Sequence, residues 1–300
     1  MSHPSRRPAA ALPRACAVLA LAFAAIVLAG CSALRMGYGQ ADTFAYIWLD
    51  RYVDFDAAQA KAARNAIAAW FAWHRRTQLP DYAELIQRAE TEMLANTTPE
   101  RACAWWGMVR TRIDRAIEQA IPPFAEIATT LTPTQLEQIE KRYAKTNKEF
   151  RDEFLQPDPA VRQAATLKRA VDRYESVYGD LESYQKERLE RWLSESPFDP
   201  ARAYEERRAR QRDALQALTR ISRDRLDPAT AQGLIRDWLQ RFFVSTTPGY
   251  RDYAERVTRH NCQIFAELHN SMSPAQRQNA SRKLHGYVTD LRALAAERAD

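Results

Sequence analysis

Leu131-Thr132-Pro133-Thr134-Gln135 is the stretch that decides the fold, because it contains the main signals of a helix N-terminus. The Thr132 hydroxyl can accept a hydrogen bond from a backbone N–H that has no partner in the first helical turn. Proline suits the first helical position, where its missing N–H is not needed. The side chain of Gln135 can accept the backbone N–H of Thr132 and complete a capping box. The stretch therefore predicts a helix from residue 133 onward.

The same pattern recurs along the chain. A capping residue followed by proline stands at Thr98-Pro99, Thr132-Pro133, Asp158-Pro159, Asp199-Pro200, Asp227-Pro228, Thr247-Pro248 and Ser273-Pro274. The order of apolar residue, cap, two residues and glutamine is repeated in Phe55-Asp56-Ala57-Ala58-Gln59 and Met272-Ser273-Pro274-Ala275-Gln276. Leu181-Glu182-Ser183-Tyr184-Gln185 departs from it, because glutamate replaces the usual cap and weakens the signal for a helix start.

Helices are expected nearly everywhere, because apolar residues recur at three- and four-residue spacing and the 300 residues include only eight glycines. Pro122-Pro123 is expected to break one helix, and Gly179 to end another. The predicted fold is all-α, either a multi-helix bundle or stacked helical hairpins of about ten helices. Two packed halves, if present, would divide near 195–200. After a short helix over 40–53, the expected helices cover residues 57–76, 81–95, 99–121, 124–130, 133–155, 159–178, 182–195, 200–225, 228–245, 248–269 and 274–298.

The N-terminus has the order of a signal sequence. Arg6, Arg7 and Arg14 precede an apolar run that begins near Ala15 and closes at Leu28-Ala29-Gly30-Cys31. A basic start, an apolar segment of this length and small residues before a cut are typical of a cleaved signal peptide. The closing stretch resembles the cleavage site of bacterial lipoproteins, in which the cysteine becomes the first residue and carries lipid. The alternative is an ordinary secretory signal with an accidental cysteine.

This resemblance divides the chain into a cleaved lipoprotein signal peptide over 1–30 and a mature, lipid-anchored helical domain over 31–300. Two or more acyl chains hold a protein stably on a membrane, so the covalent lipid on Cys31 would be the anchor. No other cofactor is expected. Ser32 follows the cysteine where inner-membrane lipoproteins of this kind often carry Asp, which favours the periplasmic face of the outer membrane.

The net charge gives no support to nucleic-acid binding. The chain carries +6, with 44 Lys and Arg residues against 38 Asp and Glu residues. The leader contains three of the basic residues and none of the acidic ones, which leaves 41 against 38, or +3, in the mature chain. Half of the excess therefore belongs to the leader, and we expect no nucleic-acid partner.

Cys103 and Cys262 remain once Cys16 in the leader and the lipid-bearing Cys31 are set aside. An oxidising compartment favours a disulfide, and one that closes so long a loop could add about 4–5 kcal/mol in the chain-entropy model. Two separate buried thiols are the alternative. The histidines of the C-terminal part have no recognised metal-ligand spacing, so no metal site is expected.

The end of helix 57–76 contains the candidate recognition patch, made of Trp70, Trp73, His74, Arg75 and Arg76. His74 lies on the same helical face as the preceding apolar residues, so it points where core residues point. The arginines suit the negative end of the helix dipole and could bind a carboxylate or phosphate. In the alternative, the tryptophans fill the core, His74 bonds a buried carbonyl and the arginines cap the helix.

The helix over 40–53 has an aromatic face. Phe44, Ile47, Trp48 and Tyr52 lie on one side of it, close to the lipid-bearing end of the mature chain. We expect this face to dock on the domain, and contact with the membrane surface is the alternative.

Several short stretches together point to a family. They are Tyr38-Gly39-Gln40, Trp48-Leu49-Asp50-Arg51-Tyr52-Val53-Asp54 with Gln59, Trp73-His74-Arg75-Arg76 with Leu79-Pro80, Leu131-Thr132-Pro133-Thr134-Gln135 and Ser273-Pro274-Ala275-Gln276-Arg277. The chain resembles, over almost its whole mature length, a family of uncharacterised, wholly helical bacterial lipoproteins. That resemblance implies an all-helical fold and a location in the cell envelope. It implies no established activity. The apolar-Thr-x-x-Gln element also resembles the motif of a small periplasmic chaperone family, although helix capping alone predicts it.

A non-catalytic binding or assembly role in the cell envelope is the expected function, with the membrane contacted through the lipid and another envelope protein as the partner. A periplasmic chaperone-like protein is one alternative. An envelope hydrolase acting on peptidoglycan or lipid is another, with Asp81 or Glu84 as an acid beside His74. The sequence has no phosphate loop, serine elbow or zinc-protease motif.

Overall fold

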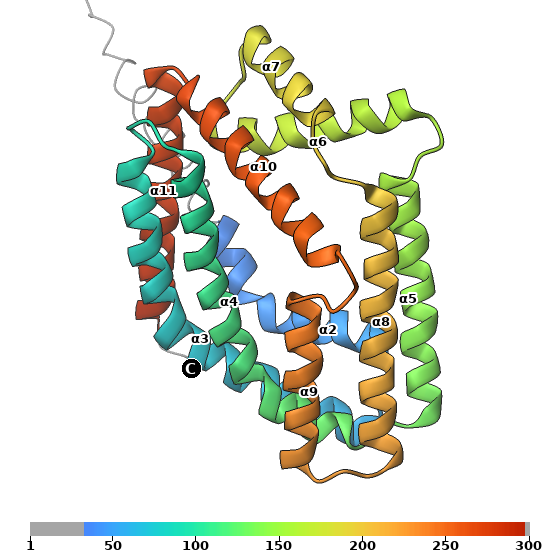
Figure 1. Ribbon diagram of the computed structural model, residues 1–300. Coiled ribbons are helices and arrows are strands. Elements are labelled where there is room, and N and C mark those ends of the chain that lie inside the picture. The colour runs from blue at the N-terminus through green and yellow to red at the C-terminus, as the bar shows by residue number, and fades with distance from the viewer. Residues whose placement is uncertain (1–32, 298–300) are drawn as a thin grey trace, which may run out of the picture.

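The computed structural model describes residues 33–297 as a succession of helices, which confirms the all-α prediction (Figure 1). The predicted signal peptide and the lipidation site Cys31 lie outside the described residues. Residues 33–39 form a short helical segment. The helices that follow are α2 (Ala41–Val53), α3 (Ala57–Glu92), α4 (Pro99–Ala128), α5 (Pro133–Phe154), α6 (Pro159–Tyr178), α7 (Ser183–Ser194), α8 (Pro200–Arg223), α9 (Pro228–Phe243), α10 (Tyr250–Asn270) and α11 (Pro274–Ala296).

Most helix starts lie where the capping signals predicted them. The predicted start at Thr247-Pro248 is wrong, because α10 begins at Tyr250 after Gly249, whose φ of 70° suits glycine. The Thr247 hydroxyl does not cap this helix and instead donates to Glu206 Oε2 (2.8 Å). Seven predicted caps accept a first-turn backbone N–H with their side chains: Asp56, Thr98, Thr132, Asp158, Asp199, Asp227 and Ser273.

Two predicted helix breaks are wrong, because α3 runs through Pro80 and α4 runs through Pro122 and Pro123. A proline inside a helix removes a backbone hydrogen bond and costs about 3 kcal/mol in isolation. Figure 1 shows both helices as bent and not straight, and a proline inside a helix favours a bend. Leu79 and Ile121, which precede the prolines, are buried in apolar cores. Tertiary packing therefore keeps both helices continuous despite the local penalty.

Two of the capping boxes meet in space and form a junction of four helices. Gln59 Nε2 donates to Gln135 Oε1 (3.1 Å), and Gln135 Nε2 donates to Gln59 Oε1 (2.5 Å). Both side chains are buried. Gln59 also donates to the carbonyl oxygen of Thr130 (3.0 Å), and Gln135 to that of Asp54 (3.0 Å). The two glutamines thus cap α3 and α5 and hold the ends of α2 and α4 against them.

The same junction occurs a second time, between α6, α7, α10 and α11. Gln185 and Gln276 exchange amide hydrogen bonds of 3.0 and 2.9 Å, and both are buried. Gln185 donates to the carbonyl oxygen of Ser271 (3.0 Å), and Gln276 to that of Asp180 (2.8 Å). The N–H of Glu182 donates to Gln185 Oε1 (2.8 Å), so the glutamine half of the box forms without the usual cap residue. The predicted start near 182 is confirmed at Ser183.

The apolar core has three parts that link distant segments of the chain. The first joins α2, α4, α5, α8 and α9, the second joins α6, α7, α10 and α11, and the third lies between α3 and α11. In Figure 1, α3 and α11 lie together on one side, α5 and α8 stand side by side on the other, and α10 crosses between them. Helices from both sides of residues 195–200 contribute to each of these cores.

Candidate functional site

His74 lies in an aromatic cluster between α3 and the helical segment 33–39. Its ring stacks on Trp70 with the ring centres 4.6 Å apart and meets Tyr82 edge to face at 5.3 Å. The Tyr38 hydroxyl and His74 Nδ1 are hydrogen-bonded to each other (2.9 Å). Burial lowers the pKa of His74 to about 4 and raises the pKa of Tyr38 to about 12. Near pH 7 the imidazole is therefore neutral and the phenol keeps its proton.

The other residues of the predicted patch lie in different surroundings. Trp70 Nε1 donates to a backbone carbonyl oxygen of α4, 2.9 Å away. Arg75 is half-buried and pairs with Glu297 (Nη1 to Oε2, 3.3 Å). Trp73 is half-buried, whereas Arg76 is exposed. The segment therefore contributes mainly to packing between helices, and Arg76 is its one fully exposed member among the five.

The acid that the hydrolase alternative requires is not beside His74. Asp81 Oδ1 accepts a hydrogen bond from Arg112 Nη2 in α4 (2.7 Å), and Glu84 is exposed. Among the described residues, the hydrogen-bond partner of His74 is Tyr38. The structure thus places no carboxylate in position to share a proton with this histidine.

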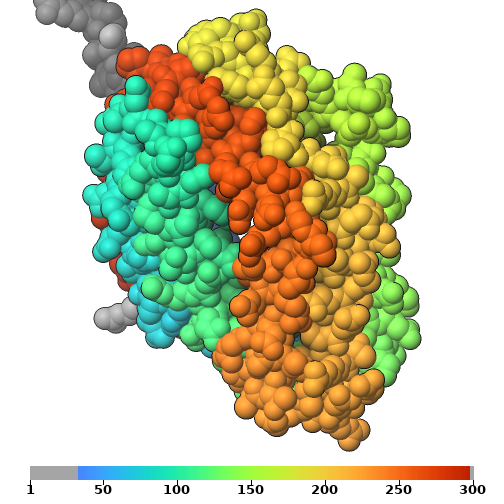
Figure 2. All heavy atoms as spheres, viewed as in Figure 1, coloured from blue at the N-terminus to red at the C-terminus, as the bar shows by residue number. Residues whose placement is uncertain are grey.

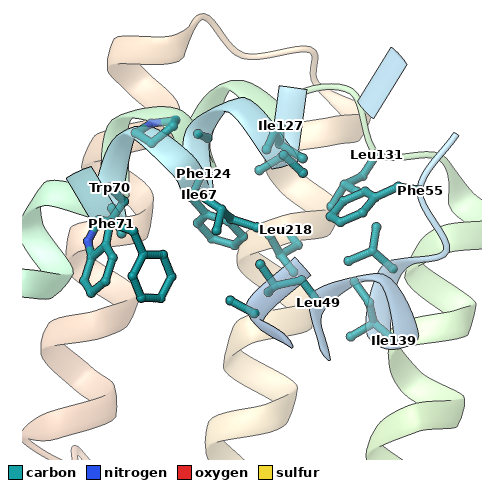
Figure 3. A pocket seen from close by; sticks show the side chains of 17 residues that line it. Leu49, Phe55, Ile67, Trp70, Phe71, Phe124, Ile127, Leu131, Ile139 and Leu218 are labelled. Atoms are coloured by element: carbon teal, nitrogen blue, oxygen red, sulfur yellow. The ribbon is translucent and has the colours of Figure 1, made fainter. Parts of the chain in front are cut away.

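Trp70 and Phe71 lie at one end of an apolar cavity of about 460 Å³ that is partly open to solvent (Figure 3). The cavity is surrounded by α2, α3, α4, α5 and α8. Figure 3 shows Leu49 of α2, Phe124 of α4 and Leu218 of α8 around the hollow. Every lining residue has an apolar side chain apart from the indole N–H of Trp70, which is already bonded to α4. The wall can therefore contact hydrocarbon, but it offers no free polar group to orient a ligand.

Small side chains create the space for this cavity. Ala63 and Ala66 line it from α3, and Ala120 and Ala128 line it from α4. Sequence analysis missed the cavity, because inward-facing alanines predict a helix face and do not reveal which alanines oppose one another. The predicted patch touches the cavity at one point, Trp70.

Cys103 of α4 and Cys262 of α10 form a disulfide, with the two sulfurs 2.04 Å and the two Cα atoms 5.5 Å apart. Figure 2 shows α4 and α10 side by side on the front face, with a narrow hollow between them.

Glu92 of α3 lines a hollow beside α4 and α10, and its carboxylate accepts hydrogen bonds from Arg101 and from Trp105 Nε1 (2.9 Å). The carboxylate of Glu92 is therefore already hydrogen-bonded within the protein.

Residues 33–297 contain no cluster of three or more His, Cys, Asp or Glu side chains placed to hold a metal ion. Over the same range, no helix has the length and apolar character needed to cross a bilayer.

Comparison with known proteins gives a family match. No curated protein and no solved structure matches the chain. A family of unknown function, DUF6279, matches residues 51–251, about two thirds of the 300 residues. The match runs from the end of α2 to the start of α10 and includes most of the cavity wall. The chain therefore belongs to this family of unknown function.

Proposed function

We propose that this protein is a non-catalytic binding protein of the bacterial cell envelope, whose ligand is an acyl chain of a membrane lipid. In this proposal the lipid on Cys31 anchors the mature chain to the periplasmic face of the outer membrane. The observation that carries the proposal is the apolar cavity between α2, α3, α4, α5 and α8.

The chemistry of the cavity wall selects the ligand class. A pocket of about 460 Å³ is within the usual range for small-molecule sites, of roughly 300–1,000 Å³. Because the wall has no free hydrogen-bonding group, a polar ligand would lose its hydration without compensation. A hydrocarbon chain has no hydrogen bonds to water to lose on entry, and one that enters from water gains about 25 cal/mol per Å² of apolar surface buried. A protein anchored to a bilayer lies next to a supply of such chains.

The two alternative functions lack a structural argument of their own. The four glutamines of the apolar-cap-x-x-Gln elements are buried and bonded to one another, so this motif serves the fold and does not favour a chaperone. The hydrolase alternative needs an acid beside His74, where the described residues place Tyr38. Binding is therefore the function that the geometry supports best.

A fluorescent fatty acid whose emission rises in apolar surroundings tests this proposal. Ala66 lines the cavity from α3, whereas Ala62 on the same helix is exposed. Phenylalanine at position 66 would fill part of the cavity, so we expect Ala66→Phe to lower the affinity for the probe about tenfold or more. The control Ala62→Phe should bind like the unmodified protein.

Circular dichroism must show that the two variants are equally folded. If Ala66→Phe does not fold, Ala120→Phe fills the cavity from α4 and replaces it. Equal probe binding by the folded cavity variant, the control and the unmodified protein would overturn the proposal. Native mass spectrometry of the purified protein should also detect a co-purified lipid that is lost in the cavity variant.

A further inference from the structure

We infer that the outward face of α2 lies in the headgroup layer of the membrane, as a second contact beside the lipid anchor. This inference rests on the proposed anchoring at Cys31. Its evidence is the exposure of Phe44, Ile47 and Trp48, together with the short tether that joins the anchor to the folded chain.

The outward face of α2 is apolar and unpartnered within the described chain. Phe44 is 62% exposed, Trp48 is 55% exposed and Ile47 is 40% exposed. The three residues are spaced at i, i+3 and i+4, so they form a single stripe along the helix. The expectation that this face docks on the domain is therefore wrong for these three residues, and only Tyr52 packs against the first core.

The tether leaves this stripe little room to move away from a bilayer. Leu34 packs against the third core, and the Tyr38 hydroxyl bonds to His74 of α3. Leu34 is three positions after Cys31, and three residues span at most about 10 Å. The helical segment 33–39 leads directly into α2. From Cys31 to Phe44 is thirteen positions, about 20 Å if helical. The stripe is thus held within reach of the headgroup layer.

The composition of the segment suits a lipid interface more than a purely electrostatic contact. Residues 33–53 contain two arginines, Arg35 and Arg51, and two aspartates, Asp42 and Asp50, so their formal net charge is zero. Tryptophan and other amphipathic aromatic residues favour the boundary between headgroups and acyl chains. An interfacial helix without net charge binds through apolar contact, so we expect this binding to resist added salt.

The opposite side of α2 lines the cavity with Ala45, Leu49 and Val53. A single helix therefore separates the proposed membrane face from the proposed acyl-chain site. This placement joins the two proposals: the helix that touches the lipid surface is also a wall of the cavity that would receive an acyl chain.

Spin labels on the lipidated protein in phosphatidylethanolamine and phosphatidylglycerol vesicles test the inference. Cys31 would be acylated, Cys103 and Cys262 are bonded, and Cys16 would leave with the leader, so an added cysteine can be labelled selectively. Ile47→Cys carries the label into the stripe. Val161→Cys is the matched control, because Val161 is an exposed apolar residue of α6, 50% accessible.

We expect the label at position 47 to collide more with dissolved oxygen than with a water-soluble nickel complex, at both low and high salt. The label at position 161 should show the reverse preference. Equal, solvent-like behaviour at both positions would overturn the inference. So would a mature protein whose mass shows no acyl chains on Cys31, because the tether would then be absent.

The outcome is separable from that of the proposed function. A label at position 47 that lies in the membrane, in a protein that binds no fatty acid, would retain this inference and remove the acyl-chain site. Fatty-acid binding by a protein whose label at position 47 is exposed to solvent would retain the acyl-chain site and remove this inference.

Discussion

Buried polar side chains at four equivalent positions set the geometry of this fold at the scale of single residues. Gln59 and Gln135 form one pair, and Gln185 and Gln276 form the other. A primary amide has both donors and acceptors, so two amides can satisfy each other while each also caps a helix. A hydrocarbon side chain could fill the space but would leave the surrounding backbone groups without partners.

Replacement of one glutamine should therefore destabilise the protein more than its size suggests. Gln135→Ala leaves the carbonyl of Asp54, the N–H of Thr132 and the amide of Gln59 without this partner. We expect the free energy of unfolding in urea to fall by about 1–3 kcal/mol or more. The exposed Gln263 is the control, and Gln263→Ala should change it by less than about 0.5 kcal/mol. A Gln59→Ala, Gln135→Ala double variant should lose less than the sum of the two single changes.

The buried histidine of α3 predicts a pH dependence. The pKa of His74 is about 4 in the folded protein, because burial disfavours the charged ring, against an ordinary value of 6.5. Below pH 6.5 the unfolded chain binds a proton that the folded protein does not, so stability falls as the pH falls from 6.5 toward 4. We expect a loss of about 2 kcal/mol from this residue.

Urea unfolding at pH 7 and pH 4.5 measures this loss. His74→Asn keeps a side chain that can hydrogen-bond to the Tyr38 hydroxyl but does not titrate, so the variant should lose less stability between the two pH values. The pKa of His269 is also lowered by burial, and its contribution remains in both proteins. An identical pH dependence in variant and unmodified protein would contradict the predicted role of His74.

At the scale of helices, the sequence predicted where most helices begin. It did not predict that α3 and α4 continue through their internal prolines. Side-chain caps are local, because a Thr or Asp bonds to an N–H two or three residues away. The effect of Pro80 or Pro122 depends on what the helix packs against, and that information lies far away in the chain. The pairing of the capping glutamines was missed for the same reason, although each glutamine was recognised as part of a helix start.

The same distinction applies to the candidate site. The inward direction of His74 followed from its helical face, but its bond to Tyr38 joins separate segments. The apolar cavity depends on alanines of two helices that meet only in the folded protein. The exposure of Phe44 and Trp48 was mispredicted, because an amphipathic pattern does not tell whether its apolar side meets protein or another apolar phase.

The disulfide between Cys103 and Cys262 links two helices that are far apart in the sequence. It joins α4 to α10 across 159 residues. In the chain-entropy model a loop of this length contributes about 4–5 kcal/mol. We expect Cys103→Ser, Cys262→Ser to lower the free energy of unfolding by about that amount while the helix content is kept. A double variant as stable as the oxidised protein would contradict this expectation, and addition of reductant should change only the unmodified protein.

At the scale of the whole molecule, the fold closes by bringing α11 against α3. Leu294 of α11 is buried in the core that these helices share, whereas Leu94 is exposed. Leu294→Ala should lower the free energy of unfolding by about 2–5 kcal/mol, and Leu94→Ala should leave it within about 0.5 kcal/mol. Thermal or urea unfolding of the two variants checks this, and similar losses at the two positions would contradict the assigned packing.

Because α3 packs against α11, this part of the core cannot form until the end of the chain has been synthesised. The end of α3 and the end of α11 are about 200 residues apart. At roughly 5–20 residues per second, the apolar side of α3 would wait about 10 to 40 s for its partner after it is made. A ribosome that stops early would release a chain whose first long helix lacks the cover that α11 supplies. Proteases and holding factors that recognise exposed apolar surface could then separate unfinished chains from finished ones without reading any signal at the terminus.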